Sequence, residues 1–485
     1  MDRSQNSLKK GHVLLFAVAF ALLQAVLAPR TFAQEILQQN VIAGVSCSNS
    51  NNGTGHVLCL EELNNPNGNP PLLGGLSWQA PNSPAPGNKG AFNAPIEAAG
   101  TVDLMTSISM SGGSFTGTPG CSNTSDGTGT VICAVEGSNN GLYGIAIHPQ
   151  PLGTLTEAQT TSPLVPLLTP GQVLTNFNFG PPSGSPCTPK YPCNRVGAIA
   201  GTPSCAATEG NMVICGVIVL LQNSLGTGIN DLIGIAFDPR VAASATNPAI
   251  LGLGNGNNFY SNPSCASSKD PAGVVNNGKM FATCGIVFVE NFFGGTATLF
   301  GASFDPRSGY NRGALTVSGS TNYGQDPSCA TPHENKGTVI CAIGLGSGNG
   351  FGTGTSSTMF GVAFDTIGRT TSTINLGAPP SGDGAWTSFG CASPVDANDN
   401  NSVACAAVTS TNKILAINFD PRTGQDPVTK AAPVFAPVTF NDPNGTSATL
   451  VSNPSCVPEN IINNQISCVI VDSFGDSVGF FAKIQ

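Results

Sequence analysis

A unit with two cysteines and a fixed ending recurs seven times along the chain, and this repeat restricts the possible folds more than any other feature. In a clear copy, Pro327-Ser328-Cys329 is followed by a polar loop, by Gly337-Thr338-Val339-Ile340-Cys341 and then by Met359-Phe360-Gly361-Val362-Ala363-Phe364-Asp365. First cysteines recur at intervals of roughly 60 to 85 residues, and such a period has to be interpreted before any local motif. The cysteine pairs are Cys47 with Cys59, Cys121 with Cys133, Cys205 with Cys215, Cys265 with Cys284, Cys329 with Cys341, Cys391 with Cys405, and Cys456 with Cys468.

Each copy is expected to form four short strands. The second cysteine lies in nearly continuous runs of β-branched and aromatic residues, as in 212–221 and 280–289, which is typical of strands covered on both faces. The ending apolar-x-Gly-x-x-aromatic-Asp-Pro, as in 299–306, predicts a third strand followed by a turn. A fourth strand follows, for example at 313–318, and no window after the first 33 residues shows a helical period.

Seven four-stranded antiparallel sheets can stack radially as a β-propeller or follow one another as a β-solenoid. Solenoid coils are much shorter than this repeat, whereas radial packing covers both faces of every sheet. We therefore expect an all-β, seven-bladed β-propeller over residues 34–485, with four strands and one internal disulfide per blade. Because the last copy ends after its third strand, residues 35–40 are expected to complete that blade.

The N-terminus has the three parts of a secretory signal peptide. Basic residues precede an apolar run at 13–27, and a small-residue cleavage site follows at 31–33. The apolar run is shorter than the roughly 20 residues that a transmembrane helix needs. We expect residues 1–33 to be removed, no membrane span to remain, and the protein to be secreted, periplasmic or at the cell surface. An uncleaved N-terminal anchor is the alternative.

Sixteen cysteines in an exported chain predict disulfides. The repeat suggests that each copy closes its own pair, and the two remaining residues, Cys187 and Cys193, are expected to pair with each other. Zinc sites favour close Cys-x-x-Cys pairs with histidine partners, whereas these cysteines are mostly more widely spaced and the chain has only 4 His. We expect no metal and no cofactor.

The composition limits the partners. Charged residues make up only 9% of the chain, against roughly 25% in ordinary soluble domains. With 40% apolar residues, 60 Gly and 37 Pro, the chain is expected to form many short strands joined by turn-rich loops rather than to be disordered. A net charge of −9 argues against nucleic acid or an anionic membrane as the partner.

Candidate catalytic groups are sparse. The sequence contains no nucleophile elbow, zinc-protease helix or phosphate-binding loop, and His148 occupies a turn position where other copies have Asp. His56 and His333 lie in loops inside cysteine pairs and have no repeated partners. The Asp residues of the turns recur from copy to copy, as structural residues do. They are Asp238, Asp305, Asp365 and Asp420. We therefore expect a protein that is not an enzyme.

One loop is rich in oxygen ligands. Residues 396–401 read Asp-Ala-Asn-Asp-Asn-Asn, a composition that hard cations such as Ca²⁺ use. The loop lacks the glycine and the terminal glutamate of an EF-hand. We favour a solvated hairpin loop.

The repeat, with its small-residue Cys strand, its apolar second strand and its third strand, resembles bacterial seven-bladed β-propeller lectins of the fucose-binding (PLL-like) type. This resemblance implies sugar binding in clefts between blades, where tryptophan faces stack on the sugar. This chain has only Trp78 and Trp386. At the third-strand position that corresponds to the lectin tryptophan it has Tyr143, Ile233, Phe300, Phe360 and Leu415.

Three clefts could therefore keep a stacking face, at Tyr143, Phe300 and Phe360. The alternative is that these rings pack between blades. Trp386, in the Gly-flanked segment 382–387 beside Asp383, is a further candidate contact for a sugar or a protein if exposed, or a plug of the rim if buried.

The function expected from the sequence is that of an exported, non-enzymatic binding protein, lectin-like or adhesin-like. It would recognise a glycan or a cell-surface protein through clefts between blades or through rim loops. A structural protein of the cell envelope or matrix is the alternative, because the chain has low charge and Gly/Asn-rich loops. A propeller-type hydrolase is a further alternative, which would need acidic residues at one end of the central channel.

Overall fold

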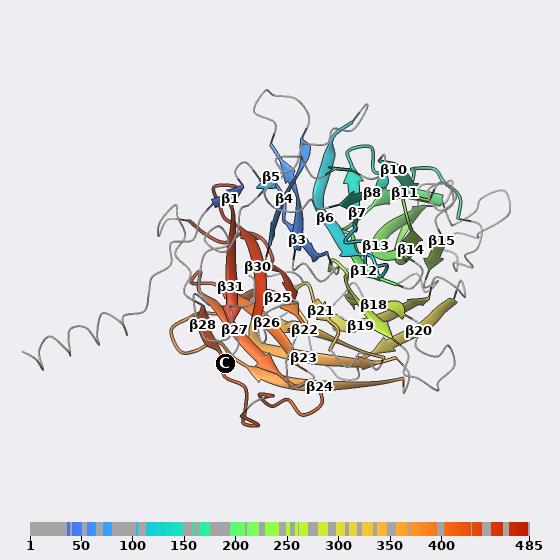
Figure 1. Ribbon diagram of the computed structural model, residues 1–485. Helices are drawn as coiled ribbons and strands as arrows, with labels where there is room; N and C mark the ends of the chain where they lie inside the picture. Colours follow the sequence, from blue (N-terminus) through green and yellow to red (C-terminus); the bar gives the residue numbers. More distant parts are fainter. Residues whose placement is uncertain are drawn as a thin grey trace, which may run out of the picture. The chain divides into compact units, whose positions relative to one another are not determined.

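A computed structural model describes about three fifths of the 485 residues, and all structural statements below concern that part. The described residues are 36–38, 41–50, 56–64, 71–79, 103–104, 113–148, 159–160, 164–174, 195–208, 211–222, 228–241, 249–252, 258–259, 261–269, 280–289, 297–305, 310–317, 323–332, 337–346, 356–366, 369–394, 402–427, 429–438, 448–458 and 465–483. Their regular elements are all β-strands (Figure 1). None of these residues belongs to a helix that could cross a bilayer.

The strands follow the sequence repeat, with each repeat named by the order of its cysteine pair. Repeat 1 contains β2 (Ser46–Asn49), β3 (His56–Leu63), β4 (Leu72–Gln79) and β5 (Asp103–Leu104). Repeat 2 contains β6 (Phe115–Asn123), β7 (Val131–Gly137), β8 (Leu142–His148), β9 (Gln159–Thr160) and β10 (Val165–Leu168). Repeat 3 contains β11 (Arg195–Ile199), β12 (Ser204–Ala207), β13 (Val213–Gln222), β14 (Gly228–Phe237) and β15 (Ala249–Gly252).

The later repeats have the same order of strands. Repeat 4 contains β16 (Asn258–Phe259), β17 (Ser264–Lys269), β18 (Met280–Val289), β19 (Ala297–Asp305) and β20 (Tyr310–Thr316). Repeat 5 contains β21 (Ser328–Ala330), β22 (Thr338–Gly346), β23 (Ser356–Asp365) and β24 (Thr370–Gly377). Repeat 6 contains β25 (Trp386–Ala392), β26 (Val403–Thr409), β27 (Ile414–Phe419) and β28 (Ala436–Val438). Repeat 7 contains β29 (Ser455–Pro458), β30 (Gln465–Val471) and β31 (Ser477–Lys483).

The seven cysteine-bearing first strands form a closed ring. In chain order β2, β6, β12, β17, β21, β25 and β29 each contact the next, and β29 contacts β2. The N-terminal strand β1 (Ile36–Gln38) pairs with β31, so the two ends of the described chain meet in one sheet (Figure 1). Sheets arranged around such a ring make the fold an all-β propeller.

Seven of the eight predicted disulfides are confirmed. In each repeat the two cysteines stand directly opposite each other on neighbouring antiparallel strands, with Cα atoms 3.9 to 4.1 Å apart. The bonded pairs are Cys47 with Cys59, Cys121 with Cys133, Cys205 with Cys215, Cys265 with Cys284, Cys329 with Cys341, Cys391 with Cys405, and Cys456 with Cys468.

Each of these bridges pins one hairpin, because its two cysteines belong to adjacent strands of the same repeat. Bridges of this number indicate an oxidising environment. The eighth predicted pair, Cys187 and Cys193, lies outside the described residues.

The prediction of a propeller with seven separate four-stranded blades is wrong. The described strands form six antiparallel sheets, because Ser356 of β23 pairs with Trp386 of β25 and joins repeats 5 and 6 into one eight-stranded sheet. Three other sheets have five strands. In two of these the first strand is split, and Pro203 and Pro263 stand at the breaks. Proline has no N–H to donate, so the ladder is interrupted there.

The third-strand motif links neighbouring repeats. A Cβ atom on Gly234 would lie 2.6 Å from the ring of Phe304 in the next repeat, closer than real Cβ atoms approach, so only glycine fits the ring. The four contacts of this kind pair Gly144 with Phe237, Gly234 with Phe304, Gly301 with Phe364, and Gly361 with Phe419. The two fixed points of the motif therefore meet across the contact between two repeats, which we call a seam.

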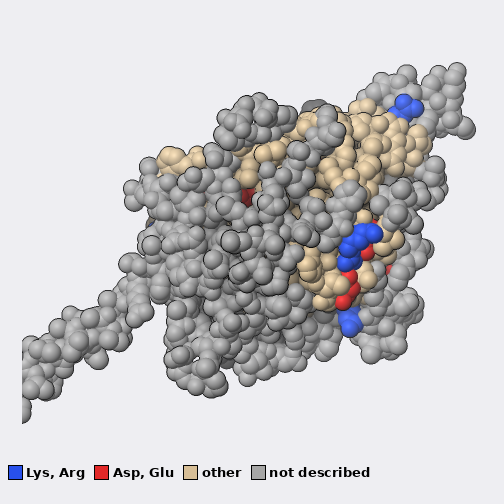
Figure 2. All heavy atoms as spheres, turned by 45° about the horizontal axis from the view of Figure 1, so that its top comes forward, with Lys and Arg blue, Asp and Glu red and all other residues tan. Residues whose placement is uncertain are grey.

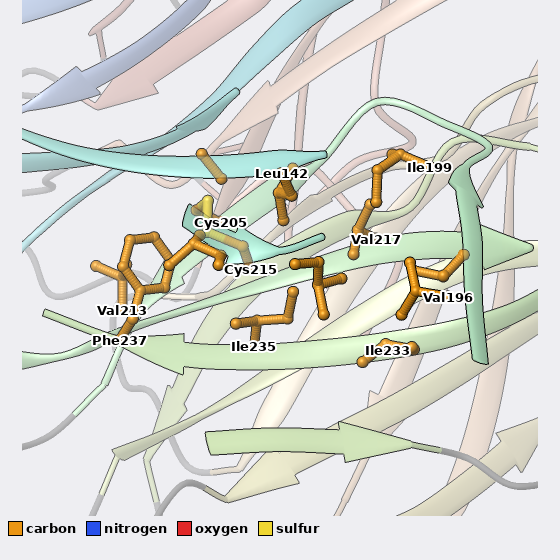
Figure 3. Packing of buried hydrophobic residues seen from close by; sticks show 14 of the residues in the cluster. Leu142, Val196, Ile199, Cys205, Val213, Cys215, Val217, Ile233, Ile235 and Phe237 are labelled. Atoms are coloured by element: carbon orange, nitrogen blue, oxygen red, sulfur yellow. A yellow bond between two sulfur atoms is a disulfide. The ribbon is translucent and has the colours of Figure 1, made fainter. Parts of the chain in front are cut away.

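Apolar side chains fill the rest of each seam. Figure 3 shows the seam between repeats 2 and 3, where Leu142 of β8 faces Val217 and Ile235 of β13 and β14 beside the Cys205–Cys215 bridge. These side chains are fully or almost fully buried. Packing of sheet against sheet around the ring is thus the source of the core.

Candidate ligand site at the centre of the ring

The segments that lead into the first strands line an open central cavity of about 540 Å³. In most repeats this segment reads X-Pro-Ser-Cys, as in Asn262-Pro263-Ser264-Cys265 and Asp326-Pro327-Ser328-Cys329. All seven repeats contribute residues to the lining. The cavity is therefore built from hydroxyl, amide and backbone groups with proline rings between them.

Serine hydroxyls connect the repeats around this cavity. The backbone N–H of Cys329 donates to Ser264 Oγ of the preceding repeat at 2.9 Å, and the same bond is made at five seams. At the other two seams the serine is replaced by Gly120 or Gly390, where a Cβ atom would lie 2.3 or 2.2 Å from a proline carbonyl oxygen of the next repeat. The serine before the cysteine thus satisfies a backbone donor and sets the spacing of the ring.

One carboxylate lies among these neutral groups. Asp326 Oδ1 accepts the backbone N–H of Asn262 at 2.8 Å, and Asp326 Oδ2 accepts the Asn262 side-chain amide at 2.9 Å. Asn453, from repeat 7, reaches the same Oδ2 at 3.5 Å. The Asn262 Oδ1 atom in turn accepts the N–H of Thr202 at 2.9 Å. Asp326, Asn262 and Asn453 therefore place fixed donors and acceptors at the lining of the cavity, and we call them the polar triad.

The three predicted stacking rings pack into the seams. Phe300 is buried and lies against Phe259 and Phe288, with ring centroids 6.1 and 5.7 Å away. Phe360 is half-buried and meets Tyr323 edge-on at 6.4 Å. Tyr143 is half-buried, and its hydroxyl accepts the Asn139 amide at 2.5 Å. None of the three lines the central cavity.

Trp386 is not the exposed contact that its Gly-flanked segment suggested. Its side chain is 0% exposed, its ring lies 4.6 Å from Phe435, and its Nε1 donates to the Gly377 carbonyl at 3.3 Å. Asp383 instead forms an ion pair with Lys413. Trp386 thus packs inside the core of the joined repeats 5 and 6.

The recurring turn aspartates hold turns. Asp420 Oδ1 accepts the backbone N–H of Arg422 at 2.8 Å, and Asp238 Oδ1 accepts that of Arg240 at 3.0 Å. Neither lines the cavity. Figure 2 shows few charged side chains on the described part of one face, with acidic and basic groups next to each other.

Arg240 also links two repeats. Its guanidinium lies 2.9 Å from Asp126 of repeat 2 as well as from Asp238. Burial alone raises the pKa of Asp126, but hydrogen bonds from Thr124, Thr128 and Arg240 outweigh it and hold that pKa below its usual range. The ion pairs of Arg240 with Asp126 and Asp238 therefore link repeats 2 and 3.

Two buried acids and one half-buried acid were missed in the sequence. Glu61 is 0% and Glu62 is 5% exposed, and Glu136 is half-buried. Burial raises the pKa of Glu61 to about 8. Burial raises that of Glu62 to about 7, and burial and then the charge of Glu62 raise that of Glu136 to about 7. A signal was present, because most other repeats have apolar residues two and three positions after the second cysteine.

Several sequence candidates lie outside the described residues. These are the oxygen-rich loop 396–401, His12, His333 and the segment 1–33. The side chains of His56 and Trp78 are likewise not described, whereas His148 is the last residue of β8. Among the described residues no three His, Cys, Asp or Glu side chains are grouped to hold a metal ion.

Comparison with known proteins gives no family. No protein-family model matches the sequence, and no characterised protein matches it significantly. Solved structures match weakly. The BP39L lectin of Burkholderia pseudomallei has a TM-score of 0.43 at 11% identity, over 93% of this chain and 97% of that chain. An α-L-arabinanase of Penicillium chrysogenum has 0.41 at 10%, over 93% and 96%.

The fucose-specific lectin of Aleuria aurantia has a TM-score of 0.39 at 9% identity, over 75% of this chain and 93% of that chain. Lectins and a glycan-cleaving enzyme thus stand side by side among the neighbours. Likenesses at such TM-scores carry no argument about function, so the site is judged from its own residues.

Proposed function

We propose that this protein is an extracytoplasmic, non-enzymatic, lectin-like binding protein that holds a neutral, polyhydroxylated ligand such as a saccharide in its central cavity. The observation that carries the proposal is the polar triad. Sugar hydroxyls donate and accept at once, and they match a carboxylate acceptor that is fixed beside amide groups. A volume of about 540 Å³ also lies within the usual range of small-ligand pockets.

Val451 of the cavity lining, with two exposed apolar side chains on adjoining segments, offers a surface for the C–H face of a sugar. Val451 lines the cavity and is 62% exposed. Phe474, 58% exposed, is the exposed aromatic side chain of the described chain, and its neighbour Gly475 accepts the backbone N–H of Val41 at 2.7 Å. Ile42, 51% exposed, follows Val41 and precedes the cavity-lining Gly44 by two residues. Such a surface beside hydrogen-bonding groups favours a saccharide over an ion.

The cavity is a better candidate than the clefts between repeats. Sugar stacking needs an open aromatic face. Phe300 and Trp386 are buried, and Tyr143 and Phe360 are packed against their seams. The ligand is therefore expected to bind at the centre.

The position of the acidic residues supports binding without catalysis. Hydrolysis of a glycosidic bond commonly uses two carboxyl groups that flank it. Asp326 is the acidic residue among the described residues that line the cavity, and Glu62, Glu136 and Asp420 lie elsewhere. A ligand in the cavity would thus meet one carboxylate.

A glycan array with the purified, oxidised protein tests the proposal, followed by calorimetric titration of the best ligand. Asp326→Asn should weaken binding at least about tenfold, because the charged acceptor is lost. Asp420→Asn is the matched control, since it removes a similar carboxylate from a turn away from the cavity, and it should leave the affinity unchanged. Absence of any glycan ligand, or equal effects of the two variants, would contradict the proposal and favour a protein partner or a structural role.

A further inference from the structure

At two neighbouring positions of its second strand, repeat 1 departs from repeats 3 to 7, and at the second of these positions repeat 2 also has a glutamate, Glu136. Glu61 and Glu62 stand two and three residues after the second cysteine, where repeat 3 has Val217 and Ile218. The corresponding residues in repeats 4 to 7 are Ile286 and Val287, Ile343 and Gly344, Ala407 and Val408, and Ile470 and Val471. Adjacent strand residues point to opposite faces, so the two glutamates face the two neighbours of repeat 1.

Glu61 lies in the seam that closes the ring, between repeats 7 and 1. Its side chain is fully buried, and neither carboxyl oxygen makes a well-formed hydrogen bond. The Ser477 hydroxyl on β31 is the group that favours its charged form, and that hydroxyl is itself buried without a well-aligned partner. Ser477 is also the residue that pairs with Gln38 of the N-terminal strand β1. A charge on Glu61 would therefore be unpaired at the point where the chain ends meet.

Glu62 lies in the other seam of repeat 1, against repeat 2. The backbone N–H of Gly117 on β6 donates to its carboxyl group, and the position of a Cβ on Gly117 is 3.8 Å from Glu136 Oε2. The pairing of β6 with β7 is irregular between Thr116 and Gly120, the stretch that contains Gly117. Two carboxyl groups thus meet in this seam, where they repel each other when both are charged.

Basic partners are absent from the described surroundings of the three acids. The described residues between 36 and 168, which cover repeats 1 and 2, include no Lys or Arg. Arg240 reaches repeat 2 at Asp126, Thr128 and Thr130, all before the start of β7, whereas Glu136 is near the end of β7. From repeat 7 the facing charged groups are Asp472 and Asp476, which are acidic and lie in the turn before Ser477.

We propose that the two seams flanking repeat 1 form a proton-dependent clasp: protonated Glu61, Glu62 and Glu136 hold repeat 1 between its neighbours, and loss of these protons loosens both seams while the other five stay closed. The other seams described above contain glycine–phenylalanine contacts or apolar packing in their place. The elevated pKa values determine whether stability rises or falls with pH. Folded protein binds these protons more tightly than unfolded chain, so the contribution to stability is full below about pH 4.5 and is lost as the pH rises toward 8.

Hydrogen exchange at two pH values tests the clasp. Protection factors, corrected for the intrinsic pH dependence of exchange, are measured by mass spectrometry at pH 5.0 and 8.5 on the full oxidised protein. Peptides that contain β3, β7 and β31 should lose protection at least about tenfold at the higher pH. Peptides that contain β14 and β19, in the seam between repeats 3 and 4, should change much less.

Variants separate this effect from a general pH response. Glu61→Gln combined with Glu62→Gln and Glu136→Gln keeps the side-chain shapes but cannot ionise, and it should abolish the pH dependence of β3, β7 and β31. The single Glu61→Gln variant, which is the milder change, should abolish it at β31 alone. Asp420→Asn is the control and should keep the wild-type pattern. Equal protection at both pH values in the wild type, or an unchanged pattern in the Gln variants, would overturn the clasp.

Discussion

The central cavity and the seams between repeats are made from the same repeated unit, but they differ in which residues they bury and which they expose. The seams bury the residues that recur, such as the Gly234–Phe304 contact, and the described third-strand aromatic rings pack into them. The cavity exposes the residues that vary between repeats, such as Asn262, Asp326 and Asn453. The difference shows that recurrence in this chain marks packing, whereas recognition is expected where the repeats diverge.

The seams also differ from one another. Most are closed by apolar packing, but the two seams around repeat 1 bury Glu61, Glu62 and Glu136 without a described basic partner. Buried acids stabilise nothing by themselves, since burying a charge is costly unless it is paired. This contrast gives predictions that separate stability from binding and one kind of seam from the other.

The largest effect is expected from emptying an apolar seam. Phe304→Ala removes a fully buried ring that lies against Gly234, and it should lower the free energy of unfolding by about 3–5 kcal/mol. Chemical denaturation measures this. Saccharide affinity of the folded fraction should be unchanged, and a large loss of affinity at unchanged stability would place the binding site in the seam instead.

Enlarging the glycine of the same contact should destabilise the protein less than removing the phenylalanine ring. Gly234→Ala places a methyl group 2.6 Å from the Phe304 ring and should lower the free energy of unfolding by about 1–3 kcal/mol. In the double variant that combines Gly234→Ala with Phe304→Leu the smaller side chain relieves the clash, so the two losses should not add. Strict additivity would show that the two residues do not interact.

The seam that buries Glu61 should lose stability as the pH rises, whereas a salt-bridged carboxylate contributes more stability as the pH rises. Wild-type stability is expected to fall between about pH 4.5 and 8, because the folded protein keeps protons on Glu61 that the unfolded chain releases. At pH 8 the free energy of unfolding of Glu61→Gln should exceed that of the wild type by on the order of 4 kcal/mol, and at pH 5 the two proteins should be nearly equally stable. Thermal melts at the two pH values measure this, and a constant difference between the proteins would contradict it.

The smallest effect is expected from removing one of the serine–cysteine hydrogen bonds that connect neighbouring repeats around the cavity. Ser264→Ala leaves the N–H of Cys329 without its acceptor and should lower the free energy of unfolding by about 1 kcal/mol. Ser267→Ala, on the same strand and half-buried, is the control. A loss for Ser264→Ala no larger than that of the control would show that solvent replaces the bond.

Much of the architecture could be predicted from the repeat, and the reasons for the failures are physical. Opposed cysteines such as Cys329 and Cys341 follow from the repeat, because each hairpin contains both partners. The number of separate sheets did not follow, because a single pairing of Ser356 with Trp386 decides whether two repeats share a sheet. The Gly-flanked segment before Trp386 is typical of a turn, but it does not show that Phe435, distant in sequence, packs against the indole.

The candidate site was harder to predict than the fold. Asn262, Asp326 and Asn453 precede a proline in three different repeats and meet only because the ring is closed. The resemblance to lectins directed attention to third-strand aromatics, which in this chain are packed. Glu61 and Glu62 could have been found by aligning the second strands, since they interrupt an apolar pattern.

The most direct test of the proposed site is a crystal structure of the protein with the best ligand from the glycan array. The account predicts density for the saccharide in the central cavity, within hydrogen-bond distance of Asp326 and Asn453. Density for the ligand in a cleft between repeats, against Tyr143 or Phe360, or at the turn aspartates, would contradict it.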